Sequence, residues 1–518
     1  MQQSDKEYGV VYLVGAGPGD PGLITRAGAR ALAEADVLVF DALVNPLLLD
    51  LAPAQAKRID VGKRGGQHKK TQGQINHLLV EQAHAGHTVV RLKGGDPYLF
   101  GRGAEEAACL ARHGVRVVVL PGVTAGIAAP ALAGIPVTHR AAASVLTFVT
   151  GHEDPAKNDT AIDYQALAAL ITKGGTVCFY MGVGRLQTIA CTLQSHGLSE
   201  DTPAAIIQWG TLPIQRSIRT TLSAAAGDCA RAGLGSPAII VVGRVAGLDE
   251  PGLDWFTDRP LFGQHIVITR TRQQASELSR KLRDQGAMVY EAPTIEIVPP
   301  GDWSAADQQV RRLSDYDWLV LTSSNGVASL VARLRACAMD ARDLAGVRLA
   351  AIGDATARAI EQQLAIRPDF IPTRFVAESL ASELLAKEDV HGKRFLLWRA
   401  DIARPALPKR LAEAGAEVTE CVAYSTRSAP SLPEDVLQAL RQGTIDWVTF
   451  TSSSTVRNMA SLLGTEKQLL ERVKIASIGP VTTDAIQALG FEPVVQAEVS
   501  NIDGLIDAIA HGAAEAEV

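Results

Sequence analysis

The sequence predicts an α/β protein of several domains, in which helices cover largely parallel sheets. Short apolar runs rich in Val, Ile and Leu alternate with helix-length periodic stretches, as in parallel β–α–β units. Aromatic residues make up only 5% of the chain, which suits helices on sheets better than a β-sandwich. At 518 residues the chain is too long for one compact core, and it predicts about three to four domains.

Composition and charge exclude several classes of protein. Hydrophobic residues make up 47% and charged residues 20%, which excludes a disordered chain, a collagen and a coiled coil. The formal net charge of −6 argues against a nucleic-acid partner. Six scattered cysteines form no CxxC pair, and the histidines lack metal-ligand spacing. We therefore expect neither a disulfide framework nor a bound metal.

No segment predicts a leader or a membrane span. The polar, acidic start MQQSDKEYGV lacks the basic flank and apolar stretch of a signal peptide. Three prolines and three glycines interrupt the uncharged run from Val117 to Val137, which we interpret as a strand, a turn, a short helix and a loop. We therefore expect a cytoplasmic protein with no membrane partner.

The first half predicts two lobes. Apolar runs that alternate with helical stretches predict parallel strands at 10–14, 37–40, 57–61, 88–92 and 115–120. After Pro121 the strands lie closer together in the sequence, and we expect them at 144–150, 176–181, 204–209, 217–222 and 238–243. Polar and apolar residues alternate in 217–222, which predicts an antiparallel strand there.

A linker and an internal repeat organise the second half. The stretch 247–262, GLDEPGLDWFTDRPLF, is rich in Pro, Gly and Asp and predicts a boundary. Beyond it, HIVITR matches KRFLLWR and DWLVLTSSNGV matches DWVTFTSSSTV, each pair offset by 129 residues. AIGDATARAI matches SIGPVTTDAI with an offset of 126 residues. This repeat predicts two similar α/β lobes made by duplication, with a binding cleft between them.

Three glycine-bearing loops follow strands of the first lobe: Gly15–Asp20, Gly94–Asp96 and Pro121–Ile127. The carboxyl ends of parallel strands share one edge, so these loops should converge on a single crevice. A dinucleotide fingerprint would need glycine where Asp20 stands, although Asp41 does end the second strand as that fingerprint requires. A nicotinamide site and a glycine turn used only for tight packing both remain alternatives.

These motifs together resemble the tetrapyrrole methyltransferase family, in particular the uroporphyrinogen-III C-methyltransferases. The resemblance covers about residues 8–248 and rests on motifs in the expected order: VGAGPGDPGLIT, VFDALV, VGKRGG, RLKGGDP, FGRGAEE, PGVTAG, GIPVTHR, VTGH, FYMG and SPAIIVVGRV. It implies two α/β lobes, about 8–122 and 123–248, with S-adenosyl-L-methionine held between them and S-adenosyl-L-homocysteine as product. It also implies a homodimer formed through this half.

The resemblance assigns roles to individual residues. Positions that match the surroundings of the methyl donor are Pro18, Gly94, Gly95, Asp96, Leu99, Thr124, Ala125, Met181, Gly210 and Ala238. Asp41 and Lys63 match a proton acceptor and a proton donor, and Arg102 matches a substrate-side residue that is an alternative base. Glu105 and Arg140 match further substrate-side positions, and Arg64 adds a cation for a substrate with eight carboxylates.

Each of these residues also has an ordinary structural interpretation. An aspartate at a strand end, such as Asp41, is often a helix cap. Lys63 and Arg64 could be plain surface charges, and Met181 taken alone would be a core residue.

The second half has hydroxyl-rich turns where strands meet helices. Thr322, Ser323 and Ser324 occupy one such turn, and Thr451 and Ser452 occupy its counterpart in the repeat. Backbone amides at helix N-termini bind anions, so several such turns in a duplicated fold predict a ligand with several anionic groups. Helix capping by serine and threonine is the structural alternative.

This half, residues 262–514 after a linker at 249–261, resembles uroporphyrinogen-III synthase. The resemblance rests on ITR, TSSNGV, IGDATA, TSSSTV and IGPVTTDA. It implies one lobe from 262–300 plus 426–514, with the other inserted as about 301–425. It also implies cyclisation of hydroxymethylbilane with loss of water, and Tyr424 matches a tyrosine that helps the hydroxyl leave. An ordinary strand aromatic is the alternative for Tyr424.

The two resemblances reinforce each other, because the product of one reaction is the substrate of the other. We therefore predict a bifunctional enzyme that makes uroporphyrinogen III and methylates it at C2 and C7 to precorrin-2. Its partners would be small-molecule tetrapyrroles. Two alternatives remain: a methyltransferase fused to a non-catalytic tetrapyrrole sensor, and an NAD(P)-dependent oxidoreductase.

Overall fold

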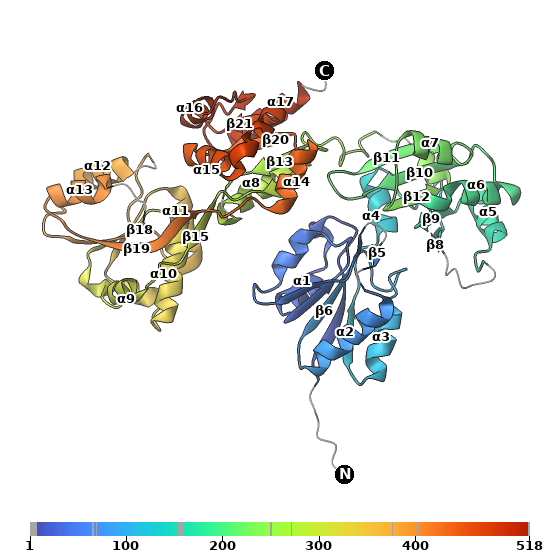
Figure 1. Cartoon of the computed structure of the whole chain (residues 1–518), viewed down its shortest axis with the longest axis horizontal. Helices are drawn as coiled ribbons and strands as arrows, with labels where there is room; N and C mark the ends of the chain where they lie inside the picture. Colours follow the sequence, from blue (N-terminus) through green and yellow to red (C-terminus); the bar gives the residue numbers. More distant parts are fainter. Residues whose placement is uncertain are drawn as a thin grey trace, which may run out of the picture. The chain divides into compact units, whose positions relative to one another are not determined.

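The computed structural model describes residues 8–64, 67–68, 70–152, 160–248, 251–270, 272–374, 377–401 and 405–515. It divides into two compact units (Figure 1). The first contains the chain up to Gln264, together with residues 281–288, and the second contains His265–Arg280 and Val289–Gly512. Both are built from sheets covered by helices, so the predicted α/β class is confirmed.

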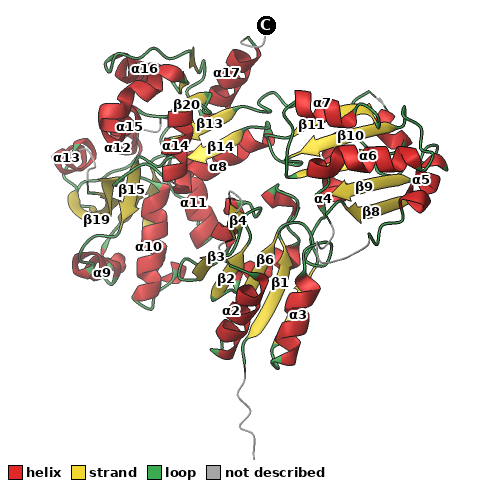
Figure 2. Cartoon of the chain, turned by 45° about the vertical axis from the view of Figure 1, so that its right-hand side comes forward, coloured by secondary structure: helices red, strands yellow, loops and turns green. Residues whose placement is uncertain are grey.

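The first lobe has a parallel five-stranded sheet in the order β3-β2-β6-β1-β7. Its strands are β1 (Val10–Gly15), β2 (Val37–Phe40), β3 (Lys57–Asp60), β6 (Val89–Lys93) and β7 (Arg116–Leu120). Helix α1 (Arg26–Ala33) covers one face, while α2 (Gln72–His84) and α3 (Gly103–Arg112) cover the other (Figure 1). Figure 2 shows α2 and α3 as helices beside the strands of this sheet. A small hairpin of β4 (Lys63–Arg64) and β5 (Gln67–His68) was not predicted.

The second lobe is a mixed sheet in the order β11-β10-β12-β9-β8. Its strands are β8 (Leu146–Thr150), β9 (Thr176–Tyr180), β10 (Pro203–Gln208), β11 (Arg216–Thr221) and β12 (Ala238–Val242). Only β8 and β9 pair in parallel, and β11 pairs antiparallel with β10, which confirms the prediction from its alternating residues. Helices α5 (Tyr164–Thr172), α6 (Leu186–Ser195) and α7 (Ala225–Arg231) cover one face, and α4 (Ala125–Leu132) covers the other.

The stretch after the second lobe is folded rather than extended. Within residues 251–264, Phe256 and Leu261 are buried, with 2% and 0% of their surface exposed. The Arg259 guanidinium lies 4.0 Å from the centre of the Phe256 ring, and its Nε donates to the Phe256 carbonyl oxygen at 2.9 Å. The segment is also fastened to residues 283–286, since the Leu261 amide donates to the Gln285 carbonyl oxygen at 2.9 Å and Arg259 Nη1 donates to that of Arg283 at 3.4 Å. A segment whose composition predicts a linker is therefore packed against the rest of its unit.

The second unit contains two related sheets. The first has the order β14-β13-β20-β21-β22, with β13 (His265–Ile268), β14 (Met288–Glu291), β20 (Trp447–Phe450), β21 (Lys474–Ser477) and β22 (Val495–Gln496). Its helices are α8 (Arg272–Asp284), α14 (Glu434–Gln442), α15 (Ser453–Leu463), α16 (Pro480–Gln487) and α17 (Ile502–Ala514).

The other sheet has the order β15-β19-β18-β16-β17. Its strands are β15 (Ile295–Val298), β16 (Trp318–Leu321), β17 (Arg348–Ala351), β18 (Arg394–Ala400) and β19 (Glu417–Ser428). Its helices are α9 (Ser304–Val310), α10 (Ser324–Ala336), α11 (Asp354–Leu364), α12 (Ala377–Lys387) and α13 (Ala406–Glu413). Strand β15, which the sequence placed in the outer lobe, pairs antiparallel with the end of β19 in this inserted lobe.

The internal repeat is visible in the contacts. In one sheet the Asp446 carboxylate accepts from the amide of His265 at 2.7 Å, and in the other Asp317 accepts from the amide of Arg394 at 2.8 Å. Both aspartates stand directly before interior strands, β20 and β16, and the strands on either side of these two also correspond: β13 and β21 in one sheet, β18 and β17 in the other. The same local sequence therefore makes the same contact between neighbouring strands in both sheets.

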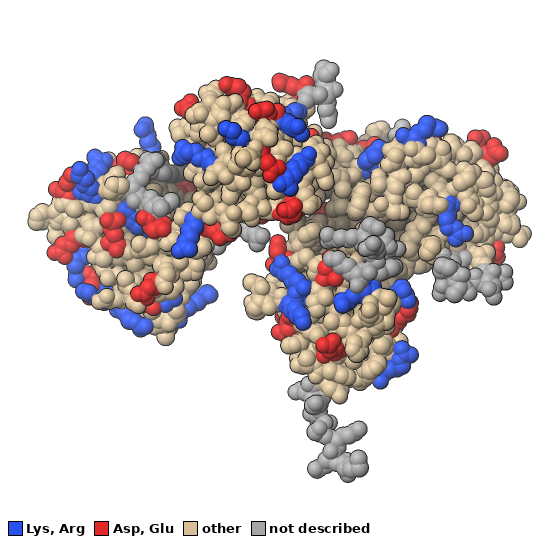
Figure 3. Space-filling model, viewed as in Figure 1, with Lys and Arg blue, Asp and Glu red and all other residues tan. Residues whose placement is uncertain are grey.

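The distribution of surface charge and the length of the helices bear on whether the chain could bind a polyanion or cross a membrane. Figure 3 shows acidic and basic side chains interspersed over the visible face of each part. Within the described ranges, no helix combines the length and the apolar character that a bilayer crossing needs.

Candidate active site

Four loops of the first lobe start at the same edge of its sheet. They are the turn Gly15–Asp20 after β1, the residue Asp41 after β2, the segment Gly94–Leu99 after β6, and Pro121–Thr124 after β7. All these strands are parallel, so their carboxyl ends meet there. The structure thus brings the glycine-bearing loops together as predicted.

Glycines let these loops approach one another closely. The Gly95 amide donates to the Gly17 carbonyl oxygen at 2.7 Å, and the Gly17 amide donates back to Gly95 at 3.3 Å. A Cβ on Gly122 would lie 2.2 Å from the Gly95 carbonyl oxygen, so no side chain fits there. Gly95 itself has φ +66° and no atom within 4 Å of where its Cβ would point, so it borders open space.

Asp96 fastens two of the loops to each other. Its Oδ1 accepts from the amides of Tyr98 at 2.8 Å and Leu99 at 3.1 Å, and its Oδ2 accepts from the amide of Gly122 at 3.1 Å. Its observed contacts are therefore with the loop backbone. Both lone pairs of Oδ1 are used by these amides, whereas Oδ2 keeps one for a ligand donor.

The second lobe contributes to the same region. Thr211, which is buried, accepts a hydrogen bond at Oγ1 from the amide of Asp20 at 3.0 Å, across 191 positions of sequence. A Cβ on Gly210 would lie 2.2 Å from the Cβ of Ala129 in α4. Met181 follows β9 with φ +54° and is 51% exposed, so it is not the core residue that its type alone would suggest. The remaining residues predicted for the donor site lie on the same loops and element ends: Pro18, Leu99, Thr124, Ala125 and Ala238.

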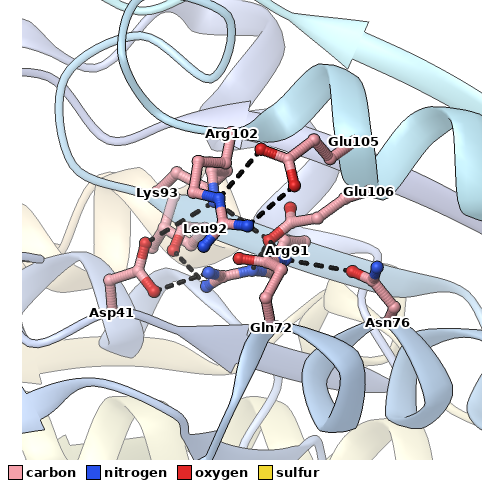
Figure 4. A network of polar contacts seen from close by, with 9 residues as sticks. All are labelled: Asp41, Gln72, Asn76, Arg91, Leu92, Lys93, Arg102, Glu105 and Glu106. Atoms are coloured by element: carbon pink, nitrogen blue, oxygen red, sulfur yellow. Dashed lines mark hydrogen bonds and ion pairs between the residues drawn. The ribbon is translucent and has the colours of Figure 1, made fainter. Parts of the chain in front are cut away.

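A cluster of buried charges lies beside these loops (Figure 4). The Arg91 Nη2 donates to Asp41 Oδ1 at 2.5 Å, and its Nε donates to Glu106 Oε1 at 3.3 Å. The Lys93 ammonium lies 3.1 Å from Glu106 Oε1 and 3.9 Å from Asp41 Oδ2. Asp41 is therefore held by cations on β6 and does not merely cap a helix.

The sequence predicts no role for Arg91, Lys93 or Glu106. Arg91 and Lys93 nevertheless lie in the RLKGGDP motif, and Glu106 lies in FGRGAEE. The sequence feature that could have revealed this cluster is the strand VVRLK, in which the cations Arg91 and Lys93 are two residues apart. Residues i and i+2 of a strand share a face, so both cations must lie on one side of a fully buried strand. Buried cations need carboxylate partners, and the first turn of α3 supplies one.

Arg102 and Glu105, both predicted on the substrate side, are paired with each other. The guanidinium donates from Nε to Glu105 Oε1 at 2.9 Å and from Nη2 to Oε2 at 2.8 Å. Hydrogen bonding by Arg102 is the main cause that lowers the pKa of Glu105. Both side chains are more than half exposed, so this pair stands at the surface.

Arg140 lies elsewhere on the second lobe, in a pocket of about 290 Å³ that Lys173 and Arg244 also line. This pocket adjoins the amino ends of β8 and β9, whereas Met181 follows the carboxyl end of β9. The structure does not bring Arg140 together with the cluster around Asp41. The side chains of Lys63 and Arg64 lie outside the described residues.

In the second unit, each hydroxyl-rich turn does join a strand to a helix N-terminus. Ser323 caps α10 by accepting from the amide of Gly326 at 3.0 Å, and Ser452 caps α15 by accepting from the amide of Thr455 at 3.3 Å. The structural alternative, helix capping, therefore holds for these two serines. Thr322, Ser324 and Thr451 are half-buried beside them.

Tyr424 lies next to one of these turns. Its hydroxyl is 2.9 Å from Oγ of Ser323, although the two residues are 101 positions apart. Only 9% of Tyr424 is exposed. Burial raises the pKa of its phenol, and the bond with Ser323 acts in the opposite direction. The two predicted residues thus form one polar site in the inserted lobe.

The fold and these sites define a methylase-type α/β unit joined to a duplicated α/β unit. A family model for tetrapyrrole (corrin/porphyrin) methylases matches residues 10–226, and one for uroporphyrinogen-III synthase HemD matches residues 276–507. The porphyrin biosynthesis protein HemD of Ruminiclostridium josui is 36% identical over 97% of each chain. The S-adenosyl-L-methionine-dependent uroporphyrinogen III methyltransferase of Methanosarcina barkeri is 48% identical over 47% of this chain and 94% of its own.

Among solved structures, uroporphyrin III C-methyl transferase from Thermus thermophilus is 38% identical, covering 46% of this chain and 99% of its own, with a TM-score of 0.40. The chain belongs to the tetrapyrrole methylases in its first half and to the uroporphyrinogen-III synthases in its second half. It is a bifunctional enzyme of tetrapyrrole biosynthesis, and both predicted families are confirmed.

Proposed function

We propose that the second half cyclises hydroxymethylbilane to uroporphyrinogen III, and that the first half transfers methyl groups from S-adenosyl-L-methionine to C2 and C7, giving precorrin-2. The observation that carries the methylation is the position of Asp41, a carboxylate held by Arg91 beside the Gly94–Gly95 loop. The name of the Methanosarcina barkeri relative supports S-adenosyl-L-methionine as the donor.

The residues of this edge fit such a donor. Gly95 borders open space, and its φ of +66° disfavours any residue with a side chain. Neighbouring loops are fixed by Asp96 and by the bond from Asp20 to Thr211, so backbone groups are held in place for a ligand. The donor, when bound, supplies a methyl group on a positively charged sulfur. Orientation of the acceptor carbon towards it provides much of the rate in such a displacement.

A proton must leave the macrocycle after each new carbon–carbon bond forms, and Asp41 is the better acceptor. Its side chain is 31% exposed, so substrate can reach it. Arg102 is the weaker candidate, because a guanidinium that donates two hydrogen bonds to Glu105 stays protonated and has no lone pair to accept with. Arg102 instead suits the binding of a substrate carboxylate. Lys63 and Arg64 keep their proposed roles as proton donor and carboxylate partner. Arg140 is kept as a proposed carboxylate partner at its own pocket by the amino ends of β8 and β9, and not beside Asp41.

In the second half, Tyr424 would donate a proton to the departing hydroxyl of hydroxymethylbilane. A phenol is protonated at neutral pH, and burial, which raises the pKa of Tyr424, acts in the same direction. The hydroxyls of Thr322, Ser323 and Ser324, with those of Thr451 and Ser452, would bind carboxylates of the linear tetrapyrrole at helix N-termini. Such a site holds a folded substrate and needs no strong acid.

One incubation tests both halves. The purified protein is given hydroxymethylbilane and S-adenosyl-L-methionine, and the products are identified by mass after oxidation. A dimethylated type-III product is expected. Type-III uroporphyrin without added methyl groups would contradict the proposed methyltransferase activity. Type-I products alone would contradict the synthase activity and favour the sensor alternative. Protection by NADPH, without binding of S-adenosyl-L-homocysteine, would favour the oxidoreductase.

Asp41→Asn separates chemistry from binding. It should lower the rate of methyl transfer at least about 100-fold, because a positioned base contributes that much. Affinity for S-adenosyl-L-homocysteine should not change. Asp50→Asn is the matched control, since Asp50 lies in the same lobe in an exposed ion pair with Arg58 at 3.5 Å. Normal turnover by Asp41→Asn would transfer the acceptor role to another group.

The proposal includes a cytoplasmic homodimer formed through the first half and working without a metal. Light scattering of the full chain should give twice the monomer mass. Dialysis against a chelator should leave both activities unchanged, and loss of either activity would contradict a metal-free mechanism.

A further inference from the structure

Four charged side chains form a buried cluster at the carboxyl end of β6 (Figure 4). Arg91 and Lys93 come from β6, Glu106 comes from the first turn of α3, and Asp41 follows β2. The two cations and two carboxylates balance in charge. Such a balance is needed because isolated charges are costly to bury.

Glu106 is the centre of this cluster. It is fully buried, and its Oε1 accepts from Arg91 Nε at 3.3 Å, from Lys93 Nζ at 3.1 Å and from Gln72 Nε2 at 3.1 Å. Its other oxygen, Oε2, has no partner in the part of the chain that the structure describes. Because Arg91 and Lys93 both donate to Glu106 Oε1, Glu106 fixes the positions of the guanidinium and the ammonium group, and so the directions of their remaining N–H donors.

Those other donors point at Asp41. Arg91 bonds to one of its oxygens at 2.5 Å, and Lys93 lies 3.9 Å from the other. Side-chain exposure rises from 0% at Glu106 through 2% at Arg91 and 5% at Lys93 to 31% at Asp41. Of the four charges, only Asp41 thus reaches the region where a substrate can bind.

We propose that Lys93, anchored by Glu106, is a positioning residue for methyl transfer: in its charged form it holds the Asp41 carboxylate towards the substrate. This inference rests on the proposed role of Asp41 as proton acceptor. Lys93 acts through Asp41 and needs no contact with substrate. Loss of its charge would leave the two carboxylates sharing Arg91 alone, and Asp41 would lose one of its two holding groups.

The surroundings of Lys93 make this charge sensitive to pH. Burial, and then the neighbouring Arg91, lower the pKa of Lys93, while Glu106 and Asp41 raise it. The charged groups that face it are Arg91 on its own strand, Asp41 after β2, and Glu106 and Glu105 from α3. Because the net effect is a lowered pKa, Lys93 loses its proton at a lower pH than an ordinary lysine. Methyl transfer should therefore decline on the alkaline side as this proton leaves.

The test is the pH profile of kcat for methylation of uroporphyrinogen III by the full chain, with S-adenosyl-L-methionine in excess. At pH values below the wild-type alkaline decline, Lys93→Met should lower kcat at least about 10-fold while KM and S-adenosyl-L-homocysteine affinity stay within about twofold. The difference from the wild type should shrink above that decline, because the wild type then loses the same charge. Lys93→Arg should recover most of the rate, and its alkaline decline should move to higher pH because guanidinium keeps its proton. Glu106→Gln should move the decline to lower pH, since it removes a carboxylate that raises the pKa of Lys93.

A double substitution checks that Lys93 acts through Asp41. If so, Asp41→Asn/Lys93→Met should be no slower than Asp41→Asn alone. Identical alkaline declines in the wild type and Lys93→Arg would overturn the inference, as would fully additive losses in the double variant. A wild-type protein that transfers no methyl group would instead refute the proposed function itself.

Discussion

The hydroxyl of Tyr180, at the end of β9, lies 2.5 Å from Oγ1 of Thr124, the residue that precedes α4. The same hydroxyl accepts from the amide of Gly126 at 2.6 Å, and a Cβ on Gly126 would lie 2.4 Å from it. Burial raises the pKa of Tyr180, so the group stays a neutral phenol. One side chain of the second lobe thus fixes the N-terminus of α4, where Thr124 and Ala125 are proposed to meet the methyl donor.

Tyr180→Phe should therefore weaken both stability and donor binding. It leaves the Gly126 amide and the Thr124 hydroxyl without this partner, which costs about 1–3 kcal/mol for buried groups. Calorimetric titration with S-adenosyl-L-homocysteine and urea unfolding measure the two effects. Tyr12→Phe is the control, because the Tyr12 hydroxyl has no hydrogen-bond partner among the described residues and its loss should change neither quantity. Equal effects of both substitutions would contradict this account.

Gly95→Ala should lower both the stability of the protein, through backbone strain, and its affinity for the donor, because the new Cβ enters the donor's space. A Cβ at φ +66° costs about 1 kcal/mol of stability, and here it would also project into the space proposed for the donor. Gly233→Ala has nearly the same φ, +60°, and equally open surroundings, but it lies after α7. Both variants should lose similar stability, whereas only Gly95→Ala should weaken S-adenosyl-L-homocysteine binding, by about 10-fold or more. Unchanged binding in Gly95→Ala would remove Gly95 from the donor site.

The strands of the first half could be predicted closely, because their apolar runs, and the polar–apolar alternation of 217–222, are local patterns typical of strands. The strand expected at 88–92 is Val89–Lys93, and the antiparallel strand expected at 217–222 is Arg216–Thr221. The boundary of the inserted lobe was harder to place. Strand β15 pairs with the end of β19, about 130 residues away, and no local pattern encodes that pairing.

The charged cluster shows why site residues were harder to predict than strands. Glu106 occupies the first turn of α3. An acidic residue at that position interacts favourably with the helix dipole, so the sequence predicts an exposed side chain there. Its complete burial comes from the packing of α3 over β6, which depends on the whole lobe. The bond between Thr211 and Asp20 likewise joins residues 191 positions apart. Motifs located the loops, but only tertiary structure shows which side chains face each other.

Leu261→Ala should reveal that the linker is a folded element. Leu261 is fully buried, so its truncation should cost about 2–5 kcal/mol, whereas Trp255→Ala removes a side chain that is 56% exposed and should cost much less. Thermal unfolding measures the difference. Limited proteolysis should cut residues 251–264 faster in Leu261→Ala than in the wild type. Rapid cleavage of the wild type there would show a flexible tether instead.

Tyr424→Phe should slow the synthase while leaving the methyltransferase intact. The phenol is the proposed proton donor to the departing hydroxyl, and a positioned acid contributes about 100-fold or more. Spontaneous closure competes with a slowed enzyme, so the type-I isomer should rise at the expense of type III. Tyr316→Phe is a close match, since Tyr316 is also 9% exposed, belongs to the same core, and donates its hydroxyl to Gln309 at 2.5 Å. It should lose stability but keep the type-III yield.

Given uroporphyrinogen III directly, Tyr424→Phe should methylate at the wild-type rate, because its site lies in the other half of the chain. A normal type-III yield from Tyr424→Phe would leave the phenol as a core side chain, and folding of the bilane would then depend on the turn hydroxyls alone.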